Sequence, residues 1–187
     1  MSKRALLVID IQNDYFPGGK WTLSNIDLAA DNAARVVRAA RSAGDLVVHV
    51  RHENLAADAP FFVAGSTGAE IHEKVLPVQG EDVVTKRYAN SFRETNLKTI
   101  LDDSDVEEVV IVGAMSHMCV DAVTRAANDL GYRVTVIHDA CASRDLEFDG
   151  VVVPAAHVHA AFMSALGFAY ADMVSTERYL GTAAKAP

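Results

Sequence analysis

Short apolar runs, rich in β-branched residues, recur along the chain and constrain its fold more than any other feature. They cover residues 5–9, 46–50, 82–85, 109–112 and 134–137, and a weaker run covers residues 168–171. Each run is continuous rather than alternating, which is typical of strands buried on both faces. The pattern therefore predicts a mostly parallel sheet that is covered by helices.

Segments with helical periodicity lie between these runs, at residues 26–43, 94–101, 118–130 and 154–166. Gly44, Gly131 and Gly167 follow three of them, at positions where glycine commonly ends a helix. Alternating strands and helices select an α/β fold, a doubly wound three-layer αβα sandwich with right-handed crossovers. With 187 residues, the chain is expected to form a single domain over 1–187. The long segment 53–80 interrupts the alternation, and we expect it to form a lid or a substrate wall.

Composition excludes several classes of partner. The formal net charge of −8 gives no electrostatic reason to expect nucleic acid or an anionic membrane surface as a partner. No apolar run approaches the about 18–20 residues of a membrane span, and the start of the chain leads directly into a strand rather than a signal peptide. Only two cysteines are present, which suits free thiols in a reducing compartment. These features predict a cytoplasmic protein.

Three polar residues follow predicted strands at the end where open α/β sheets bind their ligands. Asp10 follows the run 5–9, Lys86 follows the run 82–85, and Cys119 lies beyond the run 109–112 at the start of a predicted helix. If these three strands are neighbours, the side chains meet. The spacing alone does not establish the strand order.

The chemistry of the three residues fits a nucleophilic site. The positive end of a helix dipole and a nearby lysine both favour the thiolate form of Cys119. Asp10 is suited to accept the thiol proton and return it to a leaving amine, while Lys86 holds the carboxylate. Backbone N–H groups at the helix start are candidates for an oxyanion hole. We expect the other cysteine, Cys141, to be structural, because cysteine is among the most buried residue types.

Three motifs resemble those of the isochorismatase-like cysteine hydrolase family, in the same order along the chain. They are Asp-Ile-Gln-Asn-Asp-Tyr-Phe at 10–16, Thr-Lys-Arg-Tyr-Ala-Asn-Ser-Phe at 85–92 and Gly-Ala-Met-Ser-His-Met-Cys-Val at 113–120. The similarity runs from Leu7 to about Val174. It implies that Asp10 is the catalytic acid/base, that Lys86 is the catalytic lysine and that Cys119 is the nucleophile.

The resemblance also implies structural details. Family members have a six-stranded parallel sheet and assemble as dimers or tetramers. They carry a non-proline cis peptide shortly before the cysteine, which here would join Ala114 to Met115. The backbone amides of Met115 and Cys119 would then form the oxyanion hole.

Within the family, the presence of Cys119 argues for C–N bond cleavage. Cysteine-bearing members include nicotinamidases, carbamoyl-amide hydrolases and cyclic-amide hydrolases, whereas true isochorismatases, which cleave a vinyl ether, lack the cysteine. Nicotinamidases carry a metal site with an Asp-x-His pair after the second strand. The corresponding residues here, 50–53, contain no such pair, and Phe61 stands where a further histidine would be expected. We therefore predict no metal and no cofactor.

Aromatic and polar residues in the segments expected around the site are candidate substrate contacts. The aromatic candidates, which suggest an apolar or planar pocket, are Tyr15, Phe16, Trp21, Phe61, Phe62 and Tyr88. The polar candidates are His52, Asn90, Ser91 and His117. We expect His157 and His159 to be structural or interfacial, because residues two apart do not share a helical face.

The sequence thus predicts a cysteine hydrolase that cleaves a small amide, ureide or lactam through a thioester, with an Asp-Lys-Cys triad. Its partners would be a small-molecule substrate and further copies of the chain, with no nucleic acid and no membrane. Two alternatives stay open, which are a vinyl ether hydrolase of the isochorismatase type and a catalytically silent binding protein with the same fold.

Overall fold

A six-stranded sheet forms the centre of the computed structural model, which describes residues 3–183. The strand order is β3-β2-β1-β4-β5-β8, and every neighbouring pair is parallel. The strands are β1 (Arg4–Ile9), β2 (Leu46–His52), β3 (Asp82–Lys86), β4 (Glu108–Ala114), β5 (Arg133–Ala142) and β8 (Asp172–Val174). The predicted six-stranded parallel sheet is therefore confirmed.

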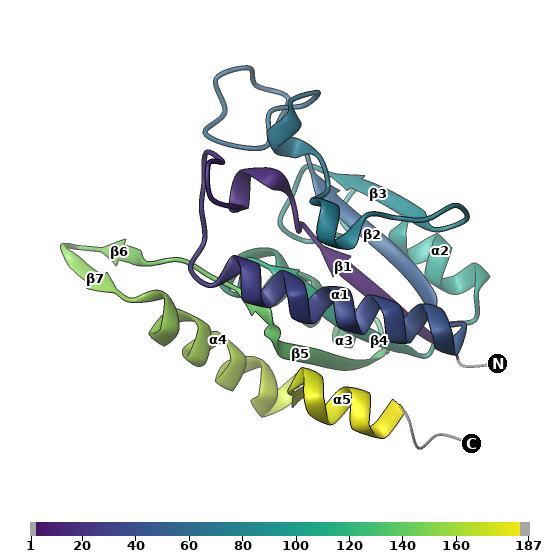
Figure 1. Cartoon of the computed structure of the whole chain (residues 1–187). Coiled ribbons are helices and arrows are strands. Elements are labelled where there is room, and N and C mark those ends of the chain that lie inside the picture. The colour runs from purple at the N-terminus through teal and green to yellow at the C-terminus, as the bar shows by residue number, and fades with distance from the viewer. Residues whose placement is uncertain (1–2, 184–187) are drawn as a thin grey trace.

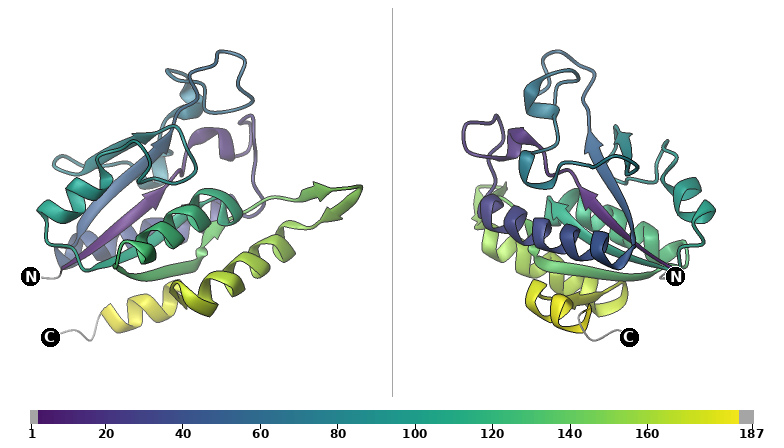
Figure 2. Two further views of the ribbon diagram at one scale, coloured as in Figure 1. Left: turned by 180° about the vertical axis from the view of Figure 1, so that it is seen from behind. Right: turned by 45° about the vertical axis from the view of Figure 1, so that its right-hand side comes forward.

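Helices cover both faces of this sheet (Figures 1 and 2). One face packs against α1 (Ile26–Ala43) and α5 (Thr176–Ala183), and the other packs against α2 (Leu97–Asp103), α3 (Asp121–Asp129) and α4 (Ala155–Ala169). Short helical turns η1 (Asn13–Tyr15), η2 (Thr67–Ala69) and η3 (Glu73–Val75) lie in the connections. The predicted three-layer αβα sandwich is confirmed. Within residues 3–183, no helix is long and apolar enough to cross a membrane.

The bounds of α1 agree with the predicted helix 26–43. Its buried side is rich in alanine, which brings the helix axis close to the sheet. Gly44 ends the helix in the left-handed conformation, with a φ of 71°, and donates its N–H to the last turn. Glycine adopts this conformation without the steric cost that a β-carbon adds.

The C-terminal part of the chain departs from the prediction. α4 continues through Gly167 to Ala169, so the expected strand at 168–171 is wrong, and the sixth strand, β8, starts at Asp172. A β-carbon on Gly167 would lie 3.0 Å from the Cγ of Met173, so this glycine provides close packing between α4 and β8 rather than a helix stop. The sequence reasoning also missed α5.

The structure also contains a hairpin that the sequence reasoning missed, formed by β6 (Leu146–Phe148) and β7 (Val151–Val153). Asp149 and Gly150 connect the two strands with positive φ values of 50° and 75°. An Asp-Gly pair between two apolar runs is the usual signal for such a turn, and it was present in the sequence. The hairpin extends away from the rest of the molecule in both figures (Figures 1 and 2).

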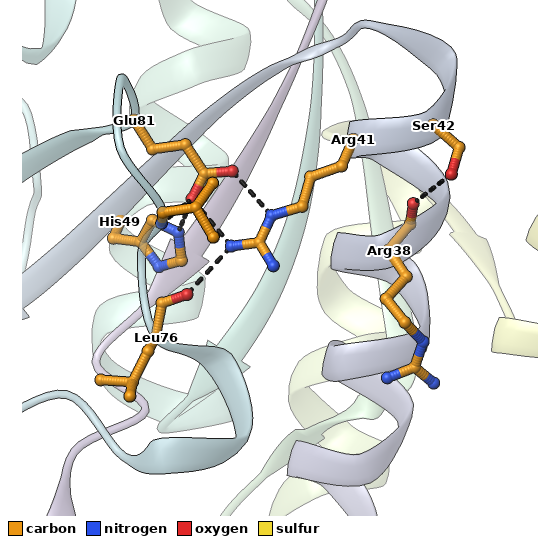
Figure 3. A network of polar contacts seen from close by, with 7 residues as sticks. Arg38, Arg41, Ser42, His49, Leu76 and Glu81 are labelled. Carbon is orange, nitrogen blue, oxygen red and sulfur yellow. Dashed lines mark hydrogen bonds and ion pairs between the residues drawn. The ribbon is translucent and has the colours of Figure 1, made fainter.

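A polar network joins the C-terminal end of α1 to the sheet beside β2 and β3 (Figure 3). Arg41 donates two hydrogen bonds to the Glu81 carboxylate, at 2.7 and 2.8 Å, and one to the carbonyl of Leu76 at 2.9 Å. The buried His49 lies 3.0 Å from the same carboxylate. Burial lowers the pKa of His49, so the neutral ring donates its Nε2–H to Glu81.

The Glu81 carboxylate is the centre of this network. Burial raises the pKa of Glu81, but hydrogen bonds from Arg41, from the backbone N–H of Val78 and from His49 outweigh burial and lower the pKa to about 2. Only 11% of the side chain is exposed, so solvent screens these contacts weakly. Glu81 therefore stabilises the fold in its ionised form.

Replacing Glu81→Gln is expected to lower the free energy of unfolding by about 1–3 kcal/mol, because Arg41 and His49 lose a charged acceptor. Since the folded-state pKa is depressed, the difference from wild type is full above the ordinary pKa of 4.5 and shrinks as the pH falls toward about 2. Urea denaturation at a series of pH values measures this difference. Arg41→Gln removes the donor of the same ion pair and should also lower the free energy of unfolding, and Arg38→Gln is its matched control, because the exposed Arg38 side chain contacts no acidic group among the described residues. A pH-independent difference would contradict this assignment.

Candidate active site

The strand order brings the three predicted residues to one edge of the sheet. Asp10 follows β1, Lys86 is the last residue of β3, and Cys119 lies in the π-helical turn η4 (Ser116–Val120) that follows β4. The chain winds outward in both directions from β1 and β4, and ligands bind at such a switch point beyond the carboxyl ends of the strands.

The backbone around Asp10 is closely packed. Asp10 is fully buried, has a positive φ of 49° and donates its N–H to the carbonyl of Val50 at 2.9 Å. In the neighbouring strand, Gly113 has a φ of 129°, and a β-carbon there would collide with the backbone of Ile9. The peptide bond between Ala114 and Met115, one residue further along, is cis.

Lys86 joins the three residues. Its Nζ lies 2.8 Å from the Asp10 carboxylate and 3.1 Å from the Cys119 Sγ. It also lies 3.2 Å from His52 Nδ1 and 3.1 Å from the carbonyl of Tyr88. An ammonium group has three protons for these four partners. Asp10 is the partner left without a hydrogen bond of good geometry, so it contacts Lys86 as an ion pair.

Burial and the neighbouring charges set the protonation of the site. Burial lowers the pKa of Lys86, but the Asp10 carboxylate raises it, so the side chain is an ammonium at neutral pH. Burial raises the pKa of the Cys119 thiol and Asp10 raises it further, while Lys86 opposes both. Lys86 does favour the thiolate, as expected, but burial and the adjacent carboxylate outweigh it, because the thiol is only 5% exposed. Its resting form is the neutral thiol.

His52 forms one wall of the site and is held by a residue that the sequence reasoning missed. Burial lowers the pKa of His52, and the charge of Lys86 lowers it further, so the neutral ring accepts from Lys86 through Nδ1. Gln12 is fully buried, accepts the backbone N–H of His52 at 2.7 Å, and donates to the carbonyls of His52 and Ala69 at 2.8 Å. A glutamine directly after a buried strand was the available signal.

Three side chains of a kind that can bind a metal ion lie close together at this site. Within residues 3–183, Asp10, His52 and Cys119 place one ligand atom each within 4.8 Å of one another. The ammonium of Lys86 contacts all three of these residues, so a cation already occupies the centre of the set. A divalent ion at that point would lie against a buried positive charge, and the residues therefore do not fit a metal.

Four of the predicted aromatic residues form one cluster beside the triad. Tyr15 contacts Phe61 and Phe62, with ring centroids 5.9 and 4.6 Å apart, and Trp21 stacks on Phe61 at 4.8 Å. The ring of Phe62 lies 6.2 Å from that of His52. Segment 53–80 supplies Phe61 and Phe62 and lies over the loop that follows β1 (Figure 1). It therefore forms a wall at this edge of the sheet.

A second buried polar residue holds this wall in place. The Asp14 carboxylate accepts the backbone N–H of Phe62 at 2.7 Å and that of Lys20 at 3.2 Å. A β-carbon on Gly68 would collide with the same carboxylate, so glycine is required there. The sequence reasoning did not single out Asp14, although it lies within the first motif.

The remaining predicted contacts lie around this centre with other partners. Phe16 stacks on His72 at 3.5 Å, and the ring of Tyr88 packs under the Arg93 guanidinium at 3.7 Å. The Asn90 side chain accepts the N–H of Phe92 within its own loop. The hydroxyl of the fully buried Ser91 has no hydrogen-bond partner among the described residues. Phe16 packs in the same apolar core as the aromatic cluster, whereas Tyr88, Asn90 and Ser91 make no ring contact with the cluster among the described residues.

His117 and His159 both support the turn that carries Cys119. His117 Nδ1 lies 2.8 Å from Ser143 Oγ. His159 Nδ1 lies 2.8 Å from the fully buried Ser116 Oγ, which donates to the carbonyl of Ala142. His159 therefore has a structural role, as expected.

Cys141 differs from Cys119 in making no hydrogen bond or ion pair with a charged side chain among the described residues. It is buried in β5, and its thiol donates to the carbonyl of Ile137 at 3.4 Å. Burial raises its pKa to about 12.

Comparison with known proteins agrees with this geometry. The family model of the isochorismatase domain matches residues 4–169. The isochorismatase family protein YddQ of Bacillus subtilis is 48% identical, over 94% of this chain and 98% of that protein. The maleamate amidohydrolase of Pseudomonas putida is 31% identical, over 76% of this chain and 73% of that protein. A solved isochorismatase hydrolase of Oleispira antarctica superposes with a TM-score of 0.92 at 55% identity, covering 95% of this chain and 96% of that one.

Alkylation of Cys119 by iodoacetamide, followed against pH in a Cys141→Ser background, tests the contacts of Lys86. Asp10→Asn removes a charge that raises the thiol pKa, so the rate profile should move to lower pH. Lys86→Met removes a charge that lowers the thiol pKa, so the profile should move to higher pH. The two shifts are opposite in sign, which a general loss of structure does not produce. Unchanged profiles in both variants would show that the three residues do not form one site.

Proposed function

Because the chain belongs to the isochorismatase family, whose members include C–N hydrolases, we propose that it cleaves the C–N bond of a small amide, ureide or lactam through a thioester on Cys119. The observation that carries the proposal is the contact of one buried ammonium, that of Lys86, with both the Asp10 carboxylate and the Cys119 sulfur. A thiol and a carboxylate that share a cation are arranged for proton transfer between them.

In the proposed mechanism, Asp10 accepts the proton of the Cys119 thiol as the sulfur attacks the substrate carbonyl. The backbone amides of Met115 and Cys119 stabilise the oxyanion of the tetrahedral intermediate. Asp10 then gives the proton to the nitrogen as the C–N bond breaks; from an amide or ureide the nitrogen leaves as an amine or ammonia, and from a lactam it stays attached to the thioester as a free amine. A water molecule, deprotonated by Asp10, attacks the thioester, and the acid product leaves as the proton returns to the sulfur.

The role of Lys86 follows from its position. When the proton moves from sulfur to carboxylate, the negative charge moves from Asp10 to Cys119, and the ammonium contacts both. The reaction needs no metal ion under this proposal, because Lys86 supplies the positive charge. A free reactive thiol also favours a reducing compartment, and on that ground we place the protein in the cytoplasm.

The two other functions make different demands on these residues. A vinyl ether hydrolase of the isochorismatase type has no need of a thiol, and a silent binding protein has no need of any triad member. The close contacts among all three residues favour the cysteine hydrolase over both.

Cys119→Ala is expected to abolish amide hydrolysis with little effect on folding, because the thioester cannot form. Ammonia release across a panel of amides, ureides and lactams measures the activity, in buffer with and without EDTA. Cys141→Ser is the matched control and should retain activity, since that thiol is buried in β5 and donates to a backbone carbonyl rather than to Asp10 or Lys86. In the wild type, a substrate adduct on the peptide that contains Cys119 should be trapped by acid quench and detected by mass spectrometry. Retention of more than about 1% of the activity by Cys119→Ala would exclude the thioester.

We further propose that the partner of this chain is a second copy of itself, which docks on the hairpin of residues 146–153 and the outer side of α4. Phe148, Val151 and Val152 of the hairpin are 84%, 62% and 59% exposed, and Phe168 near the end of α4 is 92% exposed. α4 has no Asp, Glu, Lys or Arg, although the chain has a net charge of −8. Two copies that meet here would bury the exposed apolar side chains of the hairpin against the uncharged α4.

The oligomeric state tests this surface. Light scattering coupled to size exclusion should give the mass of an oligomer for the wild type and of a monomer for the double variant Phe148→Asp, Phe168→Asp. Leu130→Asp is the matched control, because Leu130 is an exposed apolar residue that follows α3 and belongs to neither the hairpin nor α4. A monomeric wild type, or an oligomer that survives the double substitution, would refute the proposal.

A further inference from the structure

One arginine differs from the others that pack on aromatic rings. Within residues 3–183, four guanidinium groups lie over aromatic rings. Three of them also have a carboxylate partner, since Arg4 pairs with Asp45, Arg93 with Glu94 and Arg125 with Asp121. The fourth, Arg144, lies 4.2 Å from the centre of the Trp21 ring.

Arg144 has no carboxylate partner among the described residues. The hydrogen bond that its side chain makes runs from Nε to the carbonyl of Asp145 at 3.3 Å. Within residues 3–183, neither terminal NH₂ group has an acceptor. A guanidinium fork with free terminal groups matches the two oxygens of a carboxylate.

The position of Arg144 links it to the candidate active site. It follows β5, which pairs with β4 up to Ala114, at the same carboxyl edge of the sheet as Asp10 and Cys119. Burial lowers the pKa of His117, and the charge of Arg144 lowers it further; His117 belongs to the turn that contains Cys119. The preceding residue, Ser143, lies 2.8 Å from the His117 ring.

Trp21, which lies under the Arg144 guanidinium, has a second hydrogen-bond donor without a partner among the described residues. Its indole Nε1–H is buried and has no acceptor among the described residues. An unpaired buried donor costs free energy unless a ligand supplies the acceptor. Its ring also stacks on Phe61, which belongs to the aromatic wall beside His52.

We propose that Arg144, together with the indole N–H of Trp21, binds a carboxylate of the substrate, so that the substrate class is an amide that also bears a carboxylate. This inference rests on the proposed function for the reacting amide. Binding of the anion by Arg144 can be measured separately from hydrolysis of the amide. In a chain with a net charge of −8, an anionic ligand requires a local positive group that no protein carboxylate neutralises, and Arg144 meets this requirement.

Binding is measured without turnover in the Cys119→Ala variant. Trp21 is the only tryptophan of the chain, so its fluorescence reports on this place alone. The probes are the dicarboxylates malonate, succinate and glutarate, which correspond to products, and the neutral succinamide. We expect the best dicarboxylate to change the fluorescence with at least a tenfold lower Kd than succinamide. Adding Arg144→Gln should weaken dicarboxylate binding at least tenfold and leave succinamide unchanged, as confirmed by equilibrium dialysis with labelled succinate.

Kinetics provide the second measurement. With the monoamides of the same diacids, Arg144→Gln should raise KM at least tenfold with a smaller effect on kcat, whereas hydrolysis of the neutral diamides should change less than twofold. Arg144→Lys should restore part of the affinity, because it keeps the charge but not the fork. Arg125→Gln is the matched control, since Arg125 stacks on Tyr170 but is already paired with Asp121.

The outcomes separate the two proposals. Dicarboxylate binding that depends on Arg144, without hydrolysis of any amide, would support the anion site and overturn the proposed reaction. Hydrolysis of neutral and anionic amides with equal loss on Arg144→Gln, or dicarboxylate binding that ignores this substitution, would overturn the anion site and leave the reaction standing.

Discussion

The buried ammonium of Lys86 is the group on which the rest of the site depends. The side chains of Lys86 and Asp10 are both fully buried, so water solvates neither charge. Removing a lysine and a carboxylate from water costs several kcal/mol for each ion, and their attraction offsets this only when the geometry is good. The fold supplies that geometry by ending β1 and β3 at the same edge of one parallel sheet. Gln12 and Asp14 then fix the walls around the ion pair by binding the backbone of the neighbouring segments.

Much of the fold could be predicted because its signals are local. The continuous apolar runs marked β1, β2, β4 and β5, and the apolar period with Gly44 marked both ends of α1. Residues 168 and 169 were predicted to start a strand but belong to α4, and this error has a different cause. Gly167 reads as a helix stop in the sequence, but its missing side chain lets α4 pack closely on Met173, and this tertiary contact is invisible in the local pattern.

In the candidate site, too, the features with a local sequence signal could be predicted and those set by tertiary contacts could not. Asp10, Lys86 and Cys119 could be identified because each follows a strand and because their motifs resemble a known family. The protonation of Cys119 could not, since it depends on how deeply the thiol is buried and on the distance to Asp10. The helix dipole and a lysine argue for a thiolate when taken alone, but burial outweighs them. Arg144 was missed for a similar reason, because only the folded chain reveals that it lacks the acidic partner that Arg4, Arg93 and Arg125 have.

The neutral resting thiol of Cys119 and the position of Arg144 outside the triad fit one division of roles. In the resting state the charges of Asp10 and Lys86 cancel, and His52 is neutral, so the centre of the site neither attracts nor repels an anion at long range. Selection of a charged substrate must then come from a group outside the triad, and the unpaired guanidinium beside Trp21 is such a group. Within the triad, transfer of the proton from sulfur to carboxylate leaves the total charge unchanged and keeps the negative charge in contact with Lys86. Because the net charge stays the same, nucleophile activation avoids creating an uncompensated buried charge, which is the costliest step in a dry site. The separation of substrate recognition from proton transfer thus follows from placing one cation between the acid and the thiol and a second cation at the edge.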